Sequence, residues 1–143
     1  MTEFPEFLHF DLMPSFKRFE DIVAWQKARS ITQRIYSLSN RGDFAKDFSL
    51  RDQMKRASVW IMANIAEGHG RRTGPEFANF LNIARGSAVE LQSHLYVALD
   101  LSYISEIEFQ EVYAQLEEVS KMTISLAQYL RKNSANSANS VNP

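Results

Sequence analysis

The residues at 64–72, Asn-Ile-Ala-Glu-Gly-His-Gly-Arg-Arg, gather an amide, a carboxylate, an imidazole and two guanidinium groups in the middle of the chain. Carboxylates and imidazoles bind metal ions. Two pairs of such side chains could in principle share a metal ion: Glu67 with His69, and Glu90 with His94. His94 follows Glu90 by one helical turn, but the predicted helical hairpin places the two pairs near opposite ends. The sequence therefore predicts no metal site here.

No other set of residues builds a catalytic site. Di-iron bundles repeat a Glu-x-x-His motif on facing helices, whereas this spacing occurs once, at Glu6 and His9, ahead of the first predicted helix. No recognised motif places a histidine beside Ser58 or Ser87, and the segment 68–74 lacks the lysine-serine ending of a phosphate-binding loop. We predict a protein with no catalytic residue and no cofactor.

The stretch at 64–72 also has a structural interpretation. Asn64 falls on the apolar seam of a predicted helix, where an unpaired amide would cost about 1–3 kcal/mol, so we expect it to have a hydrogen-bond partner. Gly68 and Gly70 are expected to end that helix in the left-handed conformation. Gly86, inside the next helix, would permit a close backbone approach. The polar motif assigned to this structural role comprises Asn64, Glu67, Gly68, Ser87 and Glu90.

Positive charge is concentrated between Arg41 and Arg72, where seven basic residues face four acidic ones. Phosphate contact needs little more than clustered positive charge, and the residues expected to provide it are Arg51, Lys55, Arg71 and Arg72. The segment Glu106–Glu118 has five glutamates and no lysine or arginine, so it would repel a polyanion unless it faces away or is neutralised. The alternative to phosphate binding is a solvated basic face whose charges form salt bridges with Glu90 or with another subunit.

Composition bounds the class of protein. A chain of 143 residues suits one domain, and the absence of cysteine excludes disulfides and thiolate chemistry. The first 18 residues carry acidic groups and no basic residue before Lys17, unlike a secretory signal. Every apolar run is interrupted by charge before the roughly 20 residues that a membrane span needs. We expect a cytoplasmic protein that does not contact a membrane.

Apolar residues recur at alternating spacings of three and four in four windows, the pattern of helices packed nearly parallel to one another. The predicted helices cover about 19–39, 50–67, 75–101 and 109–131. Short links favour sequential helices that run antiparallel. The predicted fold is therefore all-α, an antiparallel up-down-up-down four-helix bundle over residues 19–132. An N-terminal arm (1–18) precedes it, and a disordered polar tail (133–143) is predicted from the repeated Asn-Ser-Ala.

Three hydroxyl residues stand three positions ahead of a carboxylate, which is typical of helix starts. The pairs are Ser49 with Asp52, Thr73 with Glu76, and Ser105 with Glu108. We expect each pair to satisfy free backbone amides in the first turn of a helix.

Several short motifs lie between Phe19 and Leu130. They are Trp25-x-x-Ala28, Ile35-Tyr36, Arg56-Ala57-Ser58, Asn-Ile-Ala-Glu-Gly at 64–68 with a following Arg71 or Arg72, and Ala-Arg-Gly-Ser-x-x-Glu-Leu at 84–91. In these motifs the chain resembles the 23S ribosomal RNA intervening-sequence proteins, also called four-helix bundle proteins. The resemblance implies a four-helix protomer that forms a ring-shaped homopentamer. The chain is also similar to an accessory protein of diversity-generating retroelements that binds nucleic acid, a markedly basic relative.

The functional prediction is a non-catalytic homo-oligomer, by resemblance a pentamer, with an assembly or adaptor role. Its partners are other copies of itself and an unidentified protein or nucleic acid, and the alternative function is weak, charge-driven RNA or DNA binding. A basic segment and an acidic helix can associate head-to-tail and close into a ring. Aromatic residues at helical spacing are expected in the core or a subunit interface: Trp25, Tyr36, Trp60 and Phe80.

Overall fold

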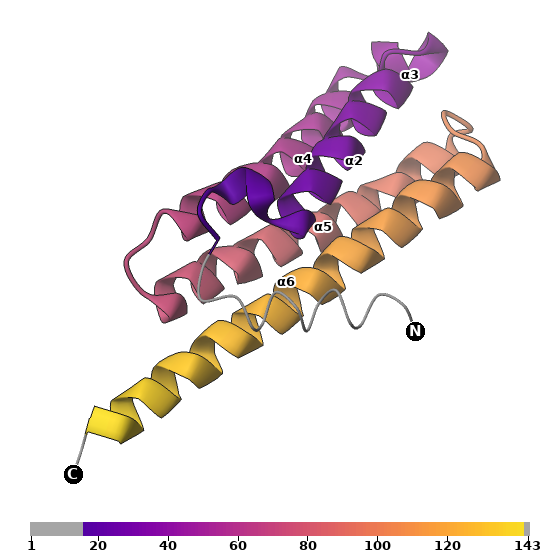
Figure 1. Cartoon of the computed structure of the whole chain (residues 1–143). Coiled ribbons are helices and arrows are strands. Elements are labelled where there is room, and N and C mark those ends of the chain that lie inside the picture. The colour runs from indigo at the N-terminus through magenta and orange to yellow at the C-terminus, as the bar shows by residue number, and fades with distance from the viewer. Residues whose placement is uncertain (1–15, 142–143) are drawn as a thin grey trace.

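The computed structural model describes residues 16–141, with side chains described as far as residue 135 (Figure 1). Within this range every regular element is a helix and there is no strand. The elements are a short 3-10 helix η1 (Phe19–Asp21) and the α-helices α2 (Val23–Ser39), α3 (Gly42–Lys46), α4 (Phe48–His69), α5 (Gly74–Asp100) and α6 (Glu106–Val141). The prediction of an all-helical protein is confirmed.

The four long helices share one apolar core. Helix α4 lies against α2 and α5, and α6 lies against α5 and α2, as Figure 1 shows. Each helix contributes residues that are almost fully buried, including Ile31, Ile35, Ile61, Leu81, Leu91 and Leu116. Burial of one such side chain contributes about 1.5–3 kcal/mol. Alanines 84 and 88 of α5 are also fully buried, so α5 can approach its neighbours closely.

Helix α3 was not predicted, because five residues are too few to show a helical period. Its side chain Phe44 is 1% exposed and stacks on Tyr103 at a ring-centroid distance of 5.1 Å. Gly42 opens the helix with a φ of 47°, a left-handed conformation that glycine adopts without strain. The link that was expected to be a simple loop therefore closes one end of the core.

Two of the three predicted helix starts are confirmed. Ser105 Oγ accepts a hydrogen bond from Glu108 N at 3.1 Å, and Glu108 Oε1 accepts one from Ser105 N at 2.9 Å. Thr73 Oγ1 accepts from Glu76 N at 3.3 Å at the start of α5. These side chains satisfy amides that the first helical turn leaves free.

The third predicted start, Ser49 with Asp52, is wrong. Helix α4 begins earlier, at Phe48, so Ser49 already lies inside it. Asp47 is the capping residue, and its Oδ1 accepts a hydrogen bond from Leu50 N at 3.2 Å. Aspartate caps a helix as well as serine does, and the buried Phe44 just before it fixes where the chain turns.

Helix α6 continues to Val141, beyond the end predicted near Arg131, so the backbone of 133–141 is helical where an unstructured tail was predicted. No proline or glycine interrupts this segment, and alanine favours the helix. Figure 1 shows this end of α6 projecting past the turn between α4 and α5. Most of the predicted arm, including Glu6 and His9, lies outside the described residues.

None of the helices in the described part of the chain has an apolar stretch long enough to cross a membrane.

Candidate functional site

Asn64 is 3% exposed and lies inside α4. Its Nδ2 donates a hydrogen bond of 2.8 Å to the backbone oxygen of Trp60, one turn earlier in the same helix. The partner is therefore local, and the amide is accommodated in the core without a polar group from α5.

Gly68 does not end the helix, whereas Gly70 does end it, but without the predicted left-handed conformation. Helix α4 runs through Gly68 to His69, and the capping residue Gly70 has a φ of −76°, which is right-handed. Gly68 is required for another reason, because a Cβ there would lie 2.7 Å from the Cβ of Phe80 and 2.9 Å from Cδ1 of Phe77. This glycine lets α4 and α5 approach closely.

Glu67 and Arg71 form an exposed pair at the end of α4. Arg71 NH2 donates to Glu67 Oε1 at 2.9 Å, and its guanidinium carbon lies 4.5 Å from the ring centroid of Phe80. Arg71 thus spans the turn between α4 and α5 through an ion pair and a cation–π contact. Arg72 is exposed beside it.

The α5 members of the predicted polar motif, Ser87 and Glu90, do not contact Asn64 or Glu67 through any hydrogen bond or ion pair within residues 16–135. Glu90 is exposed, and its partner is His94 Nε2, one turn away at 3.3 Å; no salt bridge from Lys55 or Arg56 to Glu90 occurs within residues 16–135. Ser87 is half-buried next to Gly86, where an added Cβ would meet no atom within 4 Å. Among the described residues, no three histidine or carboxylate side chains cluster closely enough to hold a metal ion.

The four predicted phosphate-contacting residues form two separate pairs. Arg51 and Lys55 lie near the start of α4, whereas Arg71 and Arg72 follow its end, which is about 30 Å away at 1.5 Å per residue. Arg51 is already engaged by Asp52, by the backbone oxygen of Ala45 and by the ring of Phe48. One protomer therefore does not bring the four cations together.

Most glutamates of α6 are neutralised or hydrogen-bonded by side chains of the same chain. Three ion pairs join the N-terminal part of the chain to this helix: Lys27 with Glu118 at 2.8 Å, Arg34 with Glu111 at 3.0 Å and Arg41 with Glu108 at 2.7 Å. Hydrogen bonds from Arg41 and from the Ser105 amide lower the pKa of Glu108 from 4.5 to about 2. The acidic helix thus attaches α2 and the start of α3, and sequence spacing does not reveal these pairs.

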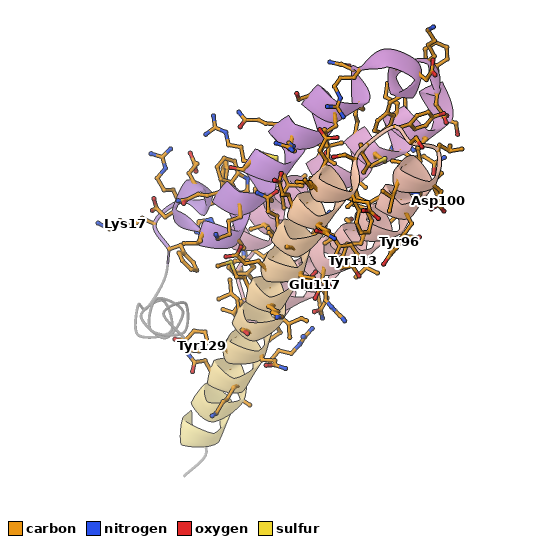
Figure 2. The ribbon with its side chains drawn as sticks, turned by 90° about the vertical axis from the view of Figure 1, so that its right-hand side faces the viewer. Lys17, Tyr96, Asp100, Tyr113, Glu117 and Tyr129 are labelled. Carbon is orange, nitrogen blue, oxygen red and sulfur yellow. The ribbon has the colours of Figure 1, made fainter. Side chains whose placement is uncertain are left out.

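An aromatic cluster between α5 and α6 was also not predicted. Tyr96 packs on Phe109 and Tyr113 at centroid distances of 4.8 and 6.0 Å. Figure 2 shows Tyr96, Tyr113 and Glu117 along this side of the molecule. Gln92, 6% exposed, donates to Glu117 Oε1 at 2.9 Å, and burial, followed by Tyr96 and Glu117, raises the pKa of Tyr113. The i, i+4 spacing of Phe109 and Tyr113 was the available signal.

The outer surface of α4 and α5 carries large apolar side chains that solvent reaches. The exposed fractions are 50% for Trp60, 53% for Ile83, 43% for Val97 and 52% for Leu101. Exposed apolar side chains such as Trp60 of α4 and Ile83 of α5 are more typical of interaction surfaces than of reaction centres.

The family model described as 23S rRNA-intervening sequence protein matches residues 20–125. The chain belongs to this family. The motif-based prediction of the family is thereby confirmed.

A solved structure similar to this intervening-sequence protein is that of a protein with unknown function from the S23 ribosomal protein family of Bacteroides thetaiotaomicron VPI-5482. The two chains are 26% identical, with a TM-score of 0.68 over 74% of this chain and 96% of the other. No curated protein matches the chain. The family match begins at residue 20, so residues 1–19 of this intervening-sequence protein lie outside it.

Proposed function

We propose that this protein is a non-catalytic homo-oligomer, a pentameric ring of four-helix protomers, with an assembly or adaptor role in the cytoplasm. Each protomer is an antiparallel up-down-up-down bundle. The short connections between α4 and α5 and between α5 and α6 support this arrangement, as does the contact of each long helix with two others. No catalytic role is assigned to any residue.

The exposed apolar surface of α4 and α5 is the observation that carries the proposal. Counted antiparallel from the contact of Gly68 with Phe77 and Phe80, Trp60 lies level with Gly86. Trp60 and Ile83 are each about half exposed, and the space beside Gly86 is open. A second copy that packs here would bury the indole and approach the backbone of α5 closely.

Light scattering of the purified full chain at micromolar concentration tests the oligomer. A pentamer of 16.4 kDa subunits should have a mass of 5 × 16.4, or 82 kDa. Trp60→Glu and Ile83→Glu should each shift the mass to smaller species, because a charge would be buried in the interface. The matched control is Ile107→Glu, since Ile107 is 69% exposed at the start of α6. A mass of 16.4 kDa for the unmodified protein would contradict the proposal.

The second candidate function is weak binding of RNA or DNA, which rests on the clustered positive charge and on the resemblance to the retroelement accessory protein inferred from sequence motifs. One structural observation favours it: most glutamates of α6 have cationic or amide partners, so they repel phosphate less than their number implies. A ring would repeat each cationic pair several times and so raise the effective concentration.

The test of the second candidate is a titration with structured RNA, single-stranded DNA and duplex DNA at low salt. Affinity should fall steeply with added salt, and Arg71→Ala with Arg72→Ala should flatten that dependence. The absence of any shift at high protein concentration would leave only the assembly or adaptor role.

A further inference from the structure

The outer surface where α2 meets α4 combines aromatic, aliphatic and basic side chains. Thr32 Oγ1 joins the two helices through Ser58 O and Met62 Sδ, both at 3.2 Å. Lys55 Nζ lies 4.9 Å from the ring centroid of Tyr36. Side chains three and four residues apart share one side of a helix, which defines the α2/α4 face as Trp25, Arg29 and Tyr36 of α2 with Lys55, Val59 and Met62 of α4.

This face is positively charged without a counter-charge. Helix α2 has no aspartate or glutamate between Ile22 and Asn40, and α4 has none between Gln53 and Ala66. Within the described residues, neither Arg29 nor Lys55 forms an ion pair with a carboxylate. By contrast, Lys27 and Arg34, which lie on the other flank of α2, pair with glutamates of α6.

The same face presents apolar surface. Tyr36 is 40% exposed and Val59 is 42% exposed. Trp25 and Met62 are half-buried and pack against the core beneath them. An occupant of this face would therefore need both apolar side chains and negative charge.

The N-terminal segment 1–15 has this composition. It contains Glu3, Glu6 and Asp11 and no lysine or arginine. Its large apolar residues are Phe4, Phe7, Leu8, Phe10, Leu12 and Met13. It is complementary to the α2/α4 face in both respects.

The segment also joins the described chain close to the α2/α4 face, at the end of α4. Phe16 O accepts a hydrogen bond from His69 Nε2 at 2.8 Å, which anchors the chain at the end of α4. From there, Val59 lies ten residues back along α4, about 15 Å, and Lys55 lies about 21 Å away. Fifteen residues can span up to roughly 50 Å, so the whole α2/α4 face is within reach.

We propose that residues 1–15 dock on the α2/α4 face of their own chain, with their phenylalanines against Tyr36 and Val59 and their carboxylates toward Arg29 and Lys55. Attachment at Phe16 holds the segment at high effective concentration beside this face, which favours the same chain over a second copy. Docking would cover the part of the basic surface that contains Lys55.

Cysteine labelling tests the proposal directly, because the full chain contains no cysteine of its own. Val59→Cys should react slowly with a maleimide in the otherwise native chain. Reversal of the arm charges, with Glu3→Lys, Glu6→Lys and Asp11→Lys, should accelerate labelling about three- to tenfold, since weak attraction to Arg29 and Lys55 is replaced by repulsion. Arg29→Glu with Lys55→Glu should restore slow labelling in the charge-reversed chain.

The control site is Val89→Cys on α5, which is similarly exposed at 50% and should label at the same rate in every background. An unchanged rate at Val59→Cys after charge reversal would overturn the proposal. Equal acceleration at both sites would also overturn it, because the whole fold would then have loosened. Protection that survives charge reversal but disappears after nuclease treatment would assign the face to nucleic acid instead.

A disulfide identifies which chain supplies the arm. Oxidation of the full chain carrying Glu6→Cys and Val59→Cys should give a cross-link within one polypeptide, which runs at the mass of a monomer on a denaturing gel. A cross-linked dimer as the sole product would overturn docking on the same chain and assign the face to a second copy.

Discussion

Gly68, in the last turn of α4, and Gly86, in the middle of α5, differ completely in their surroundings. Glycine costs a helix about 1 kcal/mol relative to alanine. At Gly68 this cost is offset by the close packing of α4 against α5, since a side chain there would collide with Phe80 and Phe77. At Gly86 nothing in the protomer comes within 4 Å of an added Cβ.

Gly68 is thus needed for packing within one chain, whereas Gly86 would be needed only if another molecule packs against α5. The close approach of α4 to α5 explains Gly68 without reference to any partner. Nothing within the described part of the protomer explains Gly86, which lies beside the exposed apolar surface of Trp60 and Ile83. In the proposed assembly, this open position is where a second copy could approach the backbone of α5 closely.

The largest expected effect is that of Gly68→Ala. The new methyl group would lie 2.7 Å from Phe80 Cβ, which is attached directly to the backbone and cannot rotate away. We expect the free energy of unfolding to fall by about 2–3 kcal/mol, despite the better helix propensity of alanine. Urea unfolding measures this. Gly70→Ala is the control, because its nearest atom is 3.4 Å away; an equal loss in both variants would show that close packing is not the cause.

Glu108→Gln tests the ion pair between Arg41 and Glu108, at the opposite end of the molecule. We expect a loss of about 1–2 kcal/mol at pH 7, because two hydrogen bonds from Arg41 lose their charge assistance. The pKa of Glu108 is lowered to about 2. The stabilisation is therefore complete above pH 4.5, and the difference between variant and wild type should disappear as the pH falls through about 2.

The free energy of unfolding of wild type and Glu108→Gln, measured from pH 7 to pH 2, gives this difference. Glu111→Gln is the control, since the side chain of Glu111 is 56% exposed against 21% for Glu108. A difference that grows on acidification would contradict the assigned ion pair.

Asn64→Leu is expected to have a smaller effect, because its hydrogen bond runs to a carbonyl of its own helix. We expect a loss of about 1 kcal/mol with unchanged helicity, measured by circular dichroism during urea unfolding. Gln33→Leu, at an exposed position of α2, should stay within about 0.5 kcal/mol of wild type. A loss of helical signal in Asn64→Leu would show that the amide has a wider role.

Gly86→Ala should have the smallest effect and the opposite sign. In the isolated subunit we expect a gain of about 0.5–1 kcal/mol, because the site is open and alanine favours a helix. If a second copy approaches α5 here, the oligomer of this variant should dissociate at a higher protein concentration than the wild-type oligomer does. Light scattering over a dilution series measures the second effect, and unchanged dissociation would remove Gly86 from the interface.

The long helices could be predicted because their apolar period extends over many turns, and the family could be predicted because its motifs fall on those turns. Helix α3 could not, since its burial depends on Phe44 meeting Tyr103, far away in sequence. The role of Gly68 was assigned to helix termination because its collision partners belong to α5. Pairings such as Arg34 with Glu111 depend on which flanks of two helices face each other, and a list of charges does not contain that information.

The two ion pairs between α2 and α6, Lys27 with Glu118 and Arg34 with Glu111, have a consequence for the order of folding. Helices adjacent in the chain, such as α4 with α5 and α5 with α6, meet by closing short loops, whereas α2 reaches α6 only after most of the chain is ordered. We therefore expect Lys27 and Glu118, which lie 91 residues apart (118 − 27) in the sequence, to be joined late in folding. Added salt should then speed unfolding while it leaves the folding rate nearly unchanged, because these charges come together after the transition state.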